Sequence, residues 1–351
     1  MLTAKPLRLA IVNTGGTIGG RADRARRVVQ TVERSRDELA KWIGGAAVMT
    51  VHTPFVVMSE NLVPHDWHTL AASIRKAADT TAIDAVLVLH GTDTMAYSAA
   101  ACSFMLADLD VPVVFTGANL PYDEPGSDGP TNIERSIAAA RSIPAGVYLC
   151  FSGEADAPAL VHRGTRARKQ HAGGTAFVTI GGPAYAEVSA DNKTTIADEN
   201  IGPRALLPER INLMSEPRRV QLVWSHPGLD FNVLRRGLEG TDIKGIVLTM
   251  YPAATVAALA GAHSASEFVE WCRRRDIAVV ATTLEPPRST INHYESTLDI
   301  RGAGAIVRTD ILPEVALAKL AWSLGATTSL KDVRAMFDID IAGERLGFTT
   351  H

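Results

Sequence analysis

Two loops in this 351-residue chain combine a threonine with glycine directly after an apolar run. In the first loop, residues 13–20, Thr17 stands among four glycines, and in the second, Thr92 follows Gly91 and precedes Asp93. A threonine hydroxyl becomes a nucleophile when a neighbouring base or proton relay takes its proton. Glycines let the backbone approach a ligand closely. These residue types therefore indicate acyl transfer with threonine as the nucleophile.

A lysine and a carboxylate can provide the relay that such a threonine needs. A desolvated lysine loses its proton more readily than one in water and can then accept the hydroxyl proton. Asp93 would orient that lysine or hold an ammonium group of the substrate, while backbone amides at a helix start would stabilise the oxyanion. Lys169 is the candidate, but it lies in a basic segment, residues 160–171, that is typical of a solvated face. It takes part only if its side chain points inward.

Each loop also has a competing interpretation. Residues 92–94 could form an ordinary turn from strand to helix, with Asp93 or Thr94 as the N-cap. The first loop fits neither the dinucleotide-binding fingerprint of oxidoreductases, because Thr17 replaces the middle glycine, nor the P-loop, because the lysine is missing. Residues 21–38 carry six arginines, which predicts a solvated loop or helix face, or a mobile lid over the site.

The elements that position these loops follow from the apolar pattern. Five strand–helix steps in the first half of the chain predict a doubly wound, mostly parallel α/β sheet. Ligands of such sheets bind at the carboxyl ends of the strands, so Ser59, Glu60 and residues 117–118 join the threonine loops as candidates. The predicted strands are 7–12, 48–57, 85–89, 111–116 and 146–151, and the predicted helices include 64–78, 95–106 and 132–141.

A change of pattern near residue 200 divides the chain. Residues 186–217 lack clear periodicity and are interpreted as an irregular arm and interdomain linker. The strand–helix alternation then restarts, and it includes a helix over 266–275 with Ser266 as its N-cap. The predicted division is a larger N-terminal α/β domain over 1–195, a linker over 196–217 and a smaller C-terminal α/β domain over 218–351.

The composition is that of an ordinary soluble globular protein, with 46% apolar and 21% charged residues. A net charge of −3 gives no basic footprint for nucleic acid. No apolar run approaches the roughly 20 residues of a transmembrane helix, and no signal-peptide pattern opens the chain. Three separated cysteines indicate buried thiols, and no metal-binding motif is present. We therefore expect a cytoplasmic protein with a small-molecule substrate and no metal, cofactor, nucleic-acid or membrane partner.

The two threonine loops together resemble motifs of the bacterial-type L-asparaginase/glutaminase family, the threonine-dependent amidohydrolases. Thr14-Gly15-Gly16-Thr17-Ile18-Gly19 looks like the first motif and His90-Gly91-Thr92-Asp93-Thr94-Met95 like the second. The likeness extends through 59–61, 117–118, 127–130, 163–169 and 312–320 and so covers nearly the whole chain. It implies hydrolysis of the side-chain amide of L-asparagine, with L-glutamine as an open alternative, through a threonine acyl-enzyme that releases ammonia without a cofactor. It also implies a homo-oligomer, a dimer or tetramer, with sites between an N-terminal domain and a neighbouring C-terminal domain.

The resemblance implies a role for each candidate. Thr17 would be the nucleophile, and Thr92, linked to Lys169 for proton transfer, would lie close to the scissile amide. Asp93 would bind the α-amino group of the substrate. Family members with glutamate at the position of Glu60 tend to accept glutamine more readily. The implied catalytic residues are Thr17, Thr92, Asp93 and Lys169, and the implied substrate-binding residues are Gly16, Ser59, Glu60, Gly91 and Ala118.

Two departures from the family pattern leave the substrate open. The family's lid carries a catalytic tyrosine shortly after the glycine loop, whereas the first tyrosine here is Tyr97. The family's Gly-x-Gly-Asn turn corresponds to residues 251–255, which lack the asparagine, and Glu285 or Glu295 could supply an acid instead. Two alternatives follow. The same chemistry could act on a different small amide or ureido acid, or the chain could be a non-catalytic amino-acid sensor.

Overall fold

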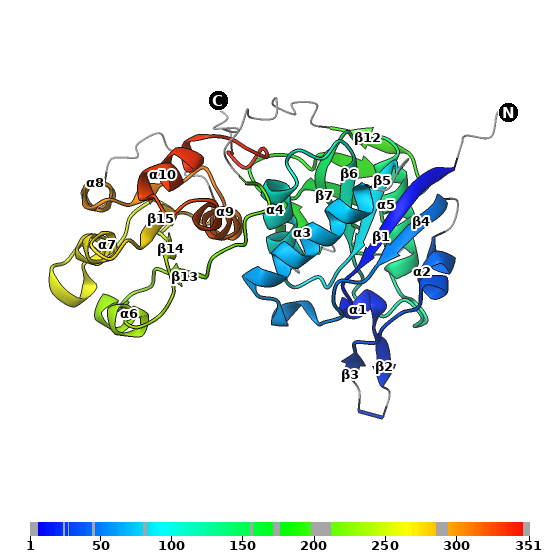
Figure 1. The fold of residues 1–351 in the computed structure, drawn as a ribbon, viewed down its shortest axis with the longest axis horizontal. Coiled ribbons are helices and arrows are strands. Elements are labelled where there is room, and N and C mark those ends of the chain that lie inside the picture. Colours follow the sequence, from blue (N-terminus) through cyan, green and yellow to red (C-terminus); the bar gives the residue numbers. More distant parts are fainter. Residues whose placement is uncertain are drawn as a thin grey trace. The chain divides into compact units, whose positions relative to one another are not determined.

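The computed structural model describes residues 6–346 except 24, 27, 44–45, 80–82, 155–156, 171–175, 198–211 and 286–293. The chain forms two compact units, Met1–Pro203 and Arg204–His351 (Figure 1). The boundary between them lies within the expected linker, 196–217. Each unit contains a sheet with helices packed on it, so the predicted α/β class with a larger N-terminal and a smaller C-terminal part is confirmed.

The larger unit is built on an eight-stranded sheet. Its five parallel strands, in spatial order, are β4 (Ala46–His52), β1 (Leu7–Asn13), β5 (Ala85–Leu89), β6 (Pro112–Thr116) and β7 (Gly146–Phe151). Every residue of β5 and β6 is buried, which is expected for parallel strands covered on both faces. The chain passes from β1 outward to β4 and then returns across β1 to β5. The strand order therefore reverses between β1 and β5, and this is the topological switch point at which such sheets bind ligands.

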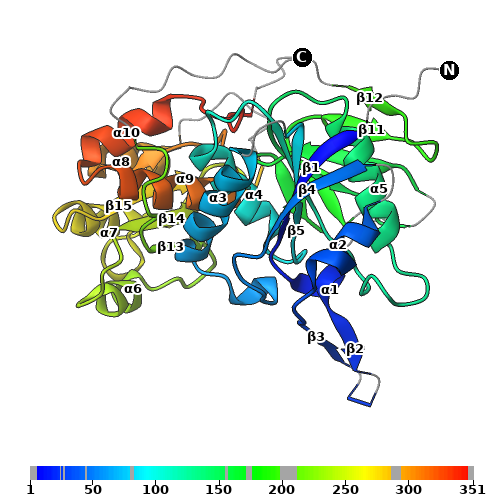
Figure 2. The same ribbon diagram turned by 45° about the vertical axis from the view of Figure 1, so that its right-hand side comes forward.

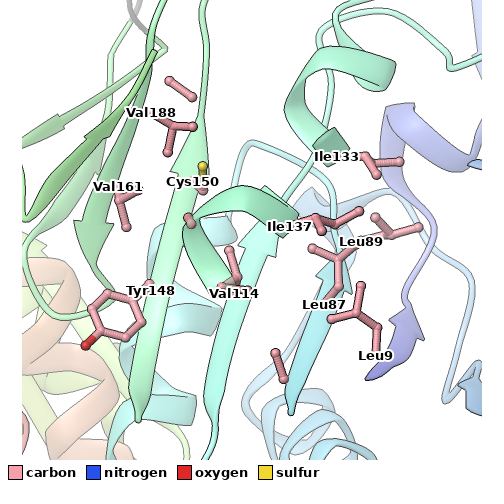
Figure 3. Packing of buried hydrophobic residues seen from close by; sticks show 14 of the residues in the cluster. Leu9, Leu87, Leu89, Val114, Ile133, Ile137, Tyr148, Cys150, Val161 and Val188 are labelled. Atoms are coloured by element: carbon pink, nitrogen blue, oxygen red, sulfur yellow. The ribbon is translucent and has the colours of Figure 1, made fainter. Parts of the chain in front are cut away.

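Besides the single turn α1 (Gly16–Gly19), four helices in the described part of the chain connect these strands: α2 (Arg36–Trp42), α3 (Pro64–Ala78), α4 (Met95–Met105) and α5 (Gly129–Ala140). α2 and α5 pack on one face, where Leu39 of α2 belongs to the same core cluster as β5. Figure 3 shows Ile137 of α5 in this cluster with Leu87 and Leu89 of β5. α3 and α4 lie beside each other on the opposite face, as both views show (Figures 1 and 2). The apolar stripes of these helices thus bury both faces of the parallel strands.

One crossover has the uncommon hand. From β5 to β6 through α4, and from β6 to β7 through α5, the chain moves in the same direction along the sheet, yet the two helices lie on opposite faces. The two crossovers therefore have opposite hands. The crossovers through α2, α3 and α4 all have the same hand. Nearly all such connections are right-handed, so these three are right-handed and the crossover through α5 is left-handed. The loop that enters α5 consequently runs toward α2. There the Tyr122 ring stacks on the Trp42 ring, with 4.1 Å between the ring centroids.

Two charged segments contain strands that the sequence did not predict. Residues 21–38, expected as a solvated loop, a helix face or a lid, begin with an antiparallel hairpin of β2 (Arg21–Asp23) and β3 (Val28–Gln30) and continue into α2. The basic segment 160–171, expected as a solvated face, contains β8 (Ala159–Arg163) and β9 (Ala167–Lys169). Successive side chains of a strand point to opposite faces of the sheet. Alternate residues of this basic segment therefore point inward although the segment is charged.

The arm expected over 186–217 is partly regular. β11 (Ala186–Val188) and β12 (Thr194–Ile196) pair antiparallel and extend the main sheet beyond β8. The small strand β10 (Phe177–Thr179) pairs with β9. These strands are only three residues long, too short for a period of two to stand out in the sequence. Residues 198–211 of the arm lie outside the described part of the chain.

The smaller unit contains a four-stranded parallel sheet, as its alternating pattern predicts. Its core gathers Phe231, Phe268 and Ile246 between the sheet and the helices. Ser264 and not Ser266 caps α7, because the Ser264 hydroxyl accepts the Glu267 amide hydrogen bond. The elements are β13 (Val220–Trp224), α6 (Phe231–Leu238), β14 (Gly245–Thr249), α7 (Ala265–Arg273), β15 (Ala278–Thr282), α8 (Glu295–Ala303), β16 (Ile306–Val307), α9 (Pro313–Ala326) and α10 (Leu330–Asp338).

Candidate active site

The two threonine loops leave the sheet on either side of its switch point. The loop after β1 begins at Thr14, whose amide and hydroxyl both donate to the carbonyl of Leu89, at 2.9 and 3.0 Å. Leu89 is the last residue of β5. A Cβ added to Gly16 would lie only 2.4 Å from the Cα and N of Gly91. The two loops are therefore in backbone contact one residue before each threonine.

Backbone conformations that favour glycine shape the first loop. Gly15 and Gly16 have φ angles of 91° and 70°, a region that L-residues with a side chain rarely adopt. The amide of Gly16 donates to the carbonyl of Val57 at 2.9 Å. The chain then forms the single turn α1 (Gly16–Gly19), which contains Thr17. The half-buried Thr17 is thus held by a backbone that only its glycine neighbours allow.

A buried arginine closes the other end of this turn. Arg34 donates from Nε to the carbonyl of Gly19 at 2.9 Å and from Nη2 to the carbonyl of Gly20 at 2.7 Å. Its Nη1 lies 2.6 Å from the Asp123 carboxylate in the loop that enters α5. With 1% of its side chain exposed, Arg34 replaces the solvent that these carbonyls would otherwise bind. It therefore fixes the position at which the hairpin β2–β3 leaves the turn α1.

Lys169 reaches the second threonine loop from β9. Its Nζ lies 2.7 Å from Thr92 Oγ1 and 2.5 Å from Asp93 Oδ1. The Lys169 side chain is only 16% exposed, whereas that of Asp93 is 61% exposed. The ammonium donates to both partners, so Thr92 Oγ1 accepts and its own hydrogen remains available for another acceptor. The inward direction that Lys169 needs is therefore observed, and its role in proton transfer stays a prediction.

Ser59 packs against the same loop from the turn η1 (Ser59–Asn61). The Thr94 hydroxyl donates to the Ser59 carbonyl at 2.8 Å, and the Thr94 amide donates to Ser59 Oγ at 3.4 Å. Thr94, one of the two residues predicted as an N-cap, is the N-cap of α4. Its hydroxyl, however, forms no hydrogen bond with a backbone amide of the helix. Its hydrogen bonds hold Ser59, which is buried, beside Gly91, while Glu60 is exposed.

The loop after β6 brings Gly117, the residue before Ala118, beside Thr92. A Cβ added to Gly117 would lie 3.3 Å from Thr92 Cγ2 and 2.5 Å from the His90 carbonyl. The Asp128 carboxylate accepts the amide of Asn119 at 2.9 Å. Asn132 in α5 donates to the carbonyl of Gly117 at 3.0 Å. The left-handed crossover thus supplies the polar side chains that fix this loop against the second threonine loop.

Two further observations concern metals and membranes. Within the described residues, no group of three or more His, Cys, Asp or Glu side chains is arranged to hold a metal ion. None of the helices in that part of the chain has the length and apolar character needed to cross a membrane.

Family models match both units of the chain. Residues 8–201 match the model described as "Asparaginase, N-terminal", and residues 219–337 match the "Glutaminase/Asparaginase C-terminal domain". The chain belongs to the asparaginase family. The resemblance of its two threonine loops to that family is thereby confirmed, and amide hydrolysis is the class of reaction that the family supports.

Solved structures and curated relatives agree with this assignment. The thermostable L-asparaginase from Thermococcus kodakarensis has a TM-score of 0.80 and 30% identity, covering 97% of this chain and all of that one. L-asparaginase I from Vibrio cholerae has a TM-score of 0.74 and 26% identity, with 97% and 99% covered. Among curated proteins, a glutamyl-tRNA(Gln) amidotransferase subunit from Thermococcus kodakarensis is 33% identical over 97% of this chain and 77% of its own length. The Saccharolobus solfataricus protein of the same name is 30% identical over 96% and 76%.

The asparaginase fold brings all nine predicted site residues to loops around the switch point or, for Lys169, to a strand that reaches it. Their roles in binding and catalysis stay predictions. Sequence reasoning missed Arg34, which positions them, and named Thr94 only as an N-cap candidate and Asp128 only within the segment 127–130. The capping pattern of Ser35 followed by Glu38 marks the start of α2 and could have shown that Arg34 precedes a helix packed against the sheet.

Gly91→Ala is expected to separate the loops of this asparaginase-family site. The new Cβ would lie 2.7 Å from Ser59 Cβ and Oγ, so Ser59 or the loop must shift. We expect a loss of about 2 kcal/mol in the free energy of unfolding, the usual range for overpacking, together with reduced turnover. Urea unfolding and ammonia release measure the two effects. Gly182→Ala, whose Cβ would meet nothing within 4 Å, is the matched control and should change neither.

Two buried histidines are expected to make stability depend on pH. Burial lowers the pKa of His90 and of His162 from the ordinary value of 6.5 to about 4. Between these values the unfolded chain binds protons that the folded chain does not, so stability is full above about pH 6.5 and is lost as pH falls toward 4. Each histidine contributes about 3 kcal/mol to that loss. Urea unfolding at pH 7.5 and 4.5 should show a smaller difference for His162→Gln than for the wild type, whereas equal differences would refute this origin.

Proposed function

We propose that the chain hydrolyses the side-chain amide of L-asparagine, with L-glutamine as a second substrate, and releases ammonia. The observation that carries this proposal is the contact of Lys169 Nζ with both Thr92 Oγ1 and Asp93 Oδ1, beside a glycine turn that presents Thr17. A non-catalytic sensor would need an amino-acid pocket but no such relay. Membership of the asparaginase family supports the same chemistry.

In the proposed reaction, Thr17 Oγ attacks the amide carbon and its proton passes through the Thr92–Lys169 relay to the amide nitrogen. The carbon–nitrogen bond breaks, ammonia leaves, and an ester to Thr17 remains. Water then attacks the ester carbon, and a water proton returns to Thr17 Oγ as the acid leaves. The backbone amides of the glycine turn would stabilise the oxyanion in both steps. No cofactor takes part in this balance.

The proposed substrate position follows from the charged groups of the site. Asp93 is 61% exposed although it is paired with Lys169, so its carboxylate can also bind the α-ammonium of an amino acid. The Ser59 backbone and hydroxyl lie beside Gly91, and Glu60 is exposed next to them. A carboxylate at Glu60 can accept a hydrogen bond from the same ammonium. These contacts favour a zwitterionic amino acid with an amide in its side chain.

We also propose that the chain works as a homo-oligomer, a dimer or tetramer. Several large apolar side chains are exposed in the smaller unit, with Trp224 46%, Leu259 77% and Leu298 46% exposed. Trp224 ends β13, Leu259 lies between β14 and α7, and Leu298 lies in α8. A second copy that packs on this unit would bury such side chains. Light scattering after size exclusion tests the proposal, and a monomer at micromolar concentration would overturn it.

A second candidate function comes from the curated relatives. Two of them are named as subunits of glutamyl-tRNA(Gln) amidotransferase and are 30–33% identical over nearly the whole chain. The amide nitrogen, once released as ammonia, can be transferred to another acceptor. The same site would then supply this ammonia to other subunits of a larger assembly. This candidate predicts that the chain alone turns over free amino-acid amides slowly.

An ammonia-release screen separates these functions. It covers L-asparagine, L-glutamine, their D-forms, and small amide and ureido acids, each at millimolar concentration. We expect the highest kcat/KM for L-asparagine. Negligible ammonia release from asparagine, with strong release from another amide or ureido acid, would show that asparagine is not the substrate. Amino-acid binding by calorimetry without release from any amide would refute hydrolysis and favour a sensor.

A further inference from the structure

A cavity in the smaller unit is lined by three arginines. It encloses about 180 Å³ between α8, the residues after β16 and the C-terminal segment. The arginines are Arg301 in α8, Arg308 after β16, and Arg345, and the one carboxylate in the lining is Asp310. None of these residues belongs to the proposed catalytic set, so a ligand of this cavity would be distinct from the substrate of amide hydrolysis.

Two of the arginines have carboxylate partners. Arg345 Nε donates to Asp310 Oδ2 at 2.7 Å, and Asp340 and Glu344 also face that guanidinium. Arg308 donates from Nη2 to Asp338. Arg345 is thus paired with Asp310, and Arg308 is paired with Asp338.

Arg308 and Arg301 each bring guanidinium donors to the cavity that have no protein partner among the described residues. Arg308 Nε is buried and has no hydrogen-bond partner, which is a costly state for a charged donor. Among the residues that the structure describes, Arg301 forms no ion pair although it lines the same cavity. Guanidinium groups bind carboxylates and phosphates through paired N–H groups and charge. An anion here would satisfy the Arg308 donor and neutralise Arg301 together.

We propose that this cavity binds a small oxyanion, a phosphate or a dicarboxylate, held by Arg301 and Arg308. The volume of about 180 Å³ is sufficient for such an anion. Binding would join α8 to the residues after β16 and so stabilise the smaller unit in proportion to occupancy.

A second basic cavity provides a control. It encloses about 280 Å³ and is lined by Arg273, Lys331 and Arg334, with apolar walls that include Val269. Arg334 is committed to the carbonyls of Gly304 and Ala305. Since no buried side-chain donor without a partner is found in this lining among the described residues, it does not share the feature that carries the proposal.

The test is calorimetric titration of the full chain with inorganic phosphate and with malonate at constant ionic strength. We expect one of the two anions to bind saturably with one site per chain, and which one binds identifies the ligand class. Arg301→Gln should weaken that binding about tenfold or more, the usual effect of a lost charge-assisted contact. Arg301 is exposed, so the variant should fold, and its urea unfolding in chloride should match the wild type.

Two matched variants complete the design. Arg236→Gln removes an exposed arginine of α6 outside both cavities, and Lys331→Gln alters the second cavity. Both should bind the anion as the wild type does. Absence of saturable binding for both anions, or equal affinity in the wild type and Arg301→Gln, would overturn the proposal, as would a loss confined to Lys331→Gln.

Discussion

Replacing Thr17 with alanine is expected to lower the rate of ammonia release by about 10⁴-fold or more. Loss of the nucleophile removes the covalent route and leaves only the contribution of substrate binding and oxyanion stabilisation. The fold should be retained, because Thr17 is half-buried and its turn is held by Gly16 and Arg34 through backbone contacts. Steady-state kinetics with the best amide of the screen measures the effect, which should appear in kcat.

Two variants in the same loop serve as controls. Thr17→Ser keeps a hydroxyl at the reacting position and should retain measurable turnover. Thr14→Val removes the hydrogen bond to the Leu89 carbonyl and should affect stability more than turnover. If Thr17→Ala keeps activity within tenfold of the wild type on every amide, Thr17 is not the nucleophile.

Lys169→Met is expected to reduce kcat by about 10³-fold, the middle of the range for a lost proton-transfer group. Methionine preserves the length and apolar stem of the side chain but cannot hold a proton near Thr92 Oγ1. The Thr92→Val variant should lose a similar factor, and the double variant should lose little more, because both residues act in one relay. The measurement is kcat across pH 6 to 9 for the wild type and these variants.

The neighbouring Arg168 provides the matched control for this substitution. Successive residues of a strand point to opposite sides, so Arg168 in β9 carries its charge away from Thr92. Arg168→Met should keep kcat within about threefold of the wild type. Equal losses for Arg168→Met and Lys169→Met would show that the charge of β9, and not the relay, supports turnover.

Much of the fold could be predicted because its strands are long or fully apolar. β5 and β7 match the residues expected from the sequence, since a continuous apolar run of five or six residues between turns leaves few alternatives. β11 and β12 could not be predicted in this way. They have three residues each, and their pairing depends on the edge of β8, which is distant in sequence.

The candidate site shows the same division. Thr17, Thr92 and Asp93 could be proposed from local sequence, because glycine turns after apolar strands are recognisable one by one. The inward direction of Lys169 could not, since it depends on the pairing of β9 with β10, and a basic run is usually solvated. The burial of Arg34 was likewise hidden, because its partners are the carbonyls of Gly19 and Gly20 and the distant Asp123.

The most direct test of the proposed mechanism is to trap the covalent intermediate. The wild-type chain is mixed with saturating L-asparagine, quenched in acid within milliseconds, digested and examined by mass spectrometry. We expect the acyl group on the peptide that contains Thr17, and its absence from the Thr17→Ala variant treated in the same way. An acyl group on the peptide that contains Thr92, or an adduct that persists in Thr17→Ala, would contradict the assignment of Thr17 as the nucleophile.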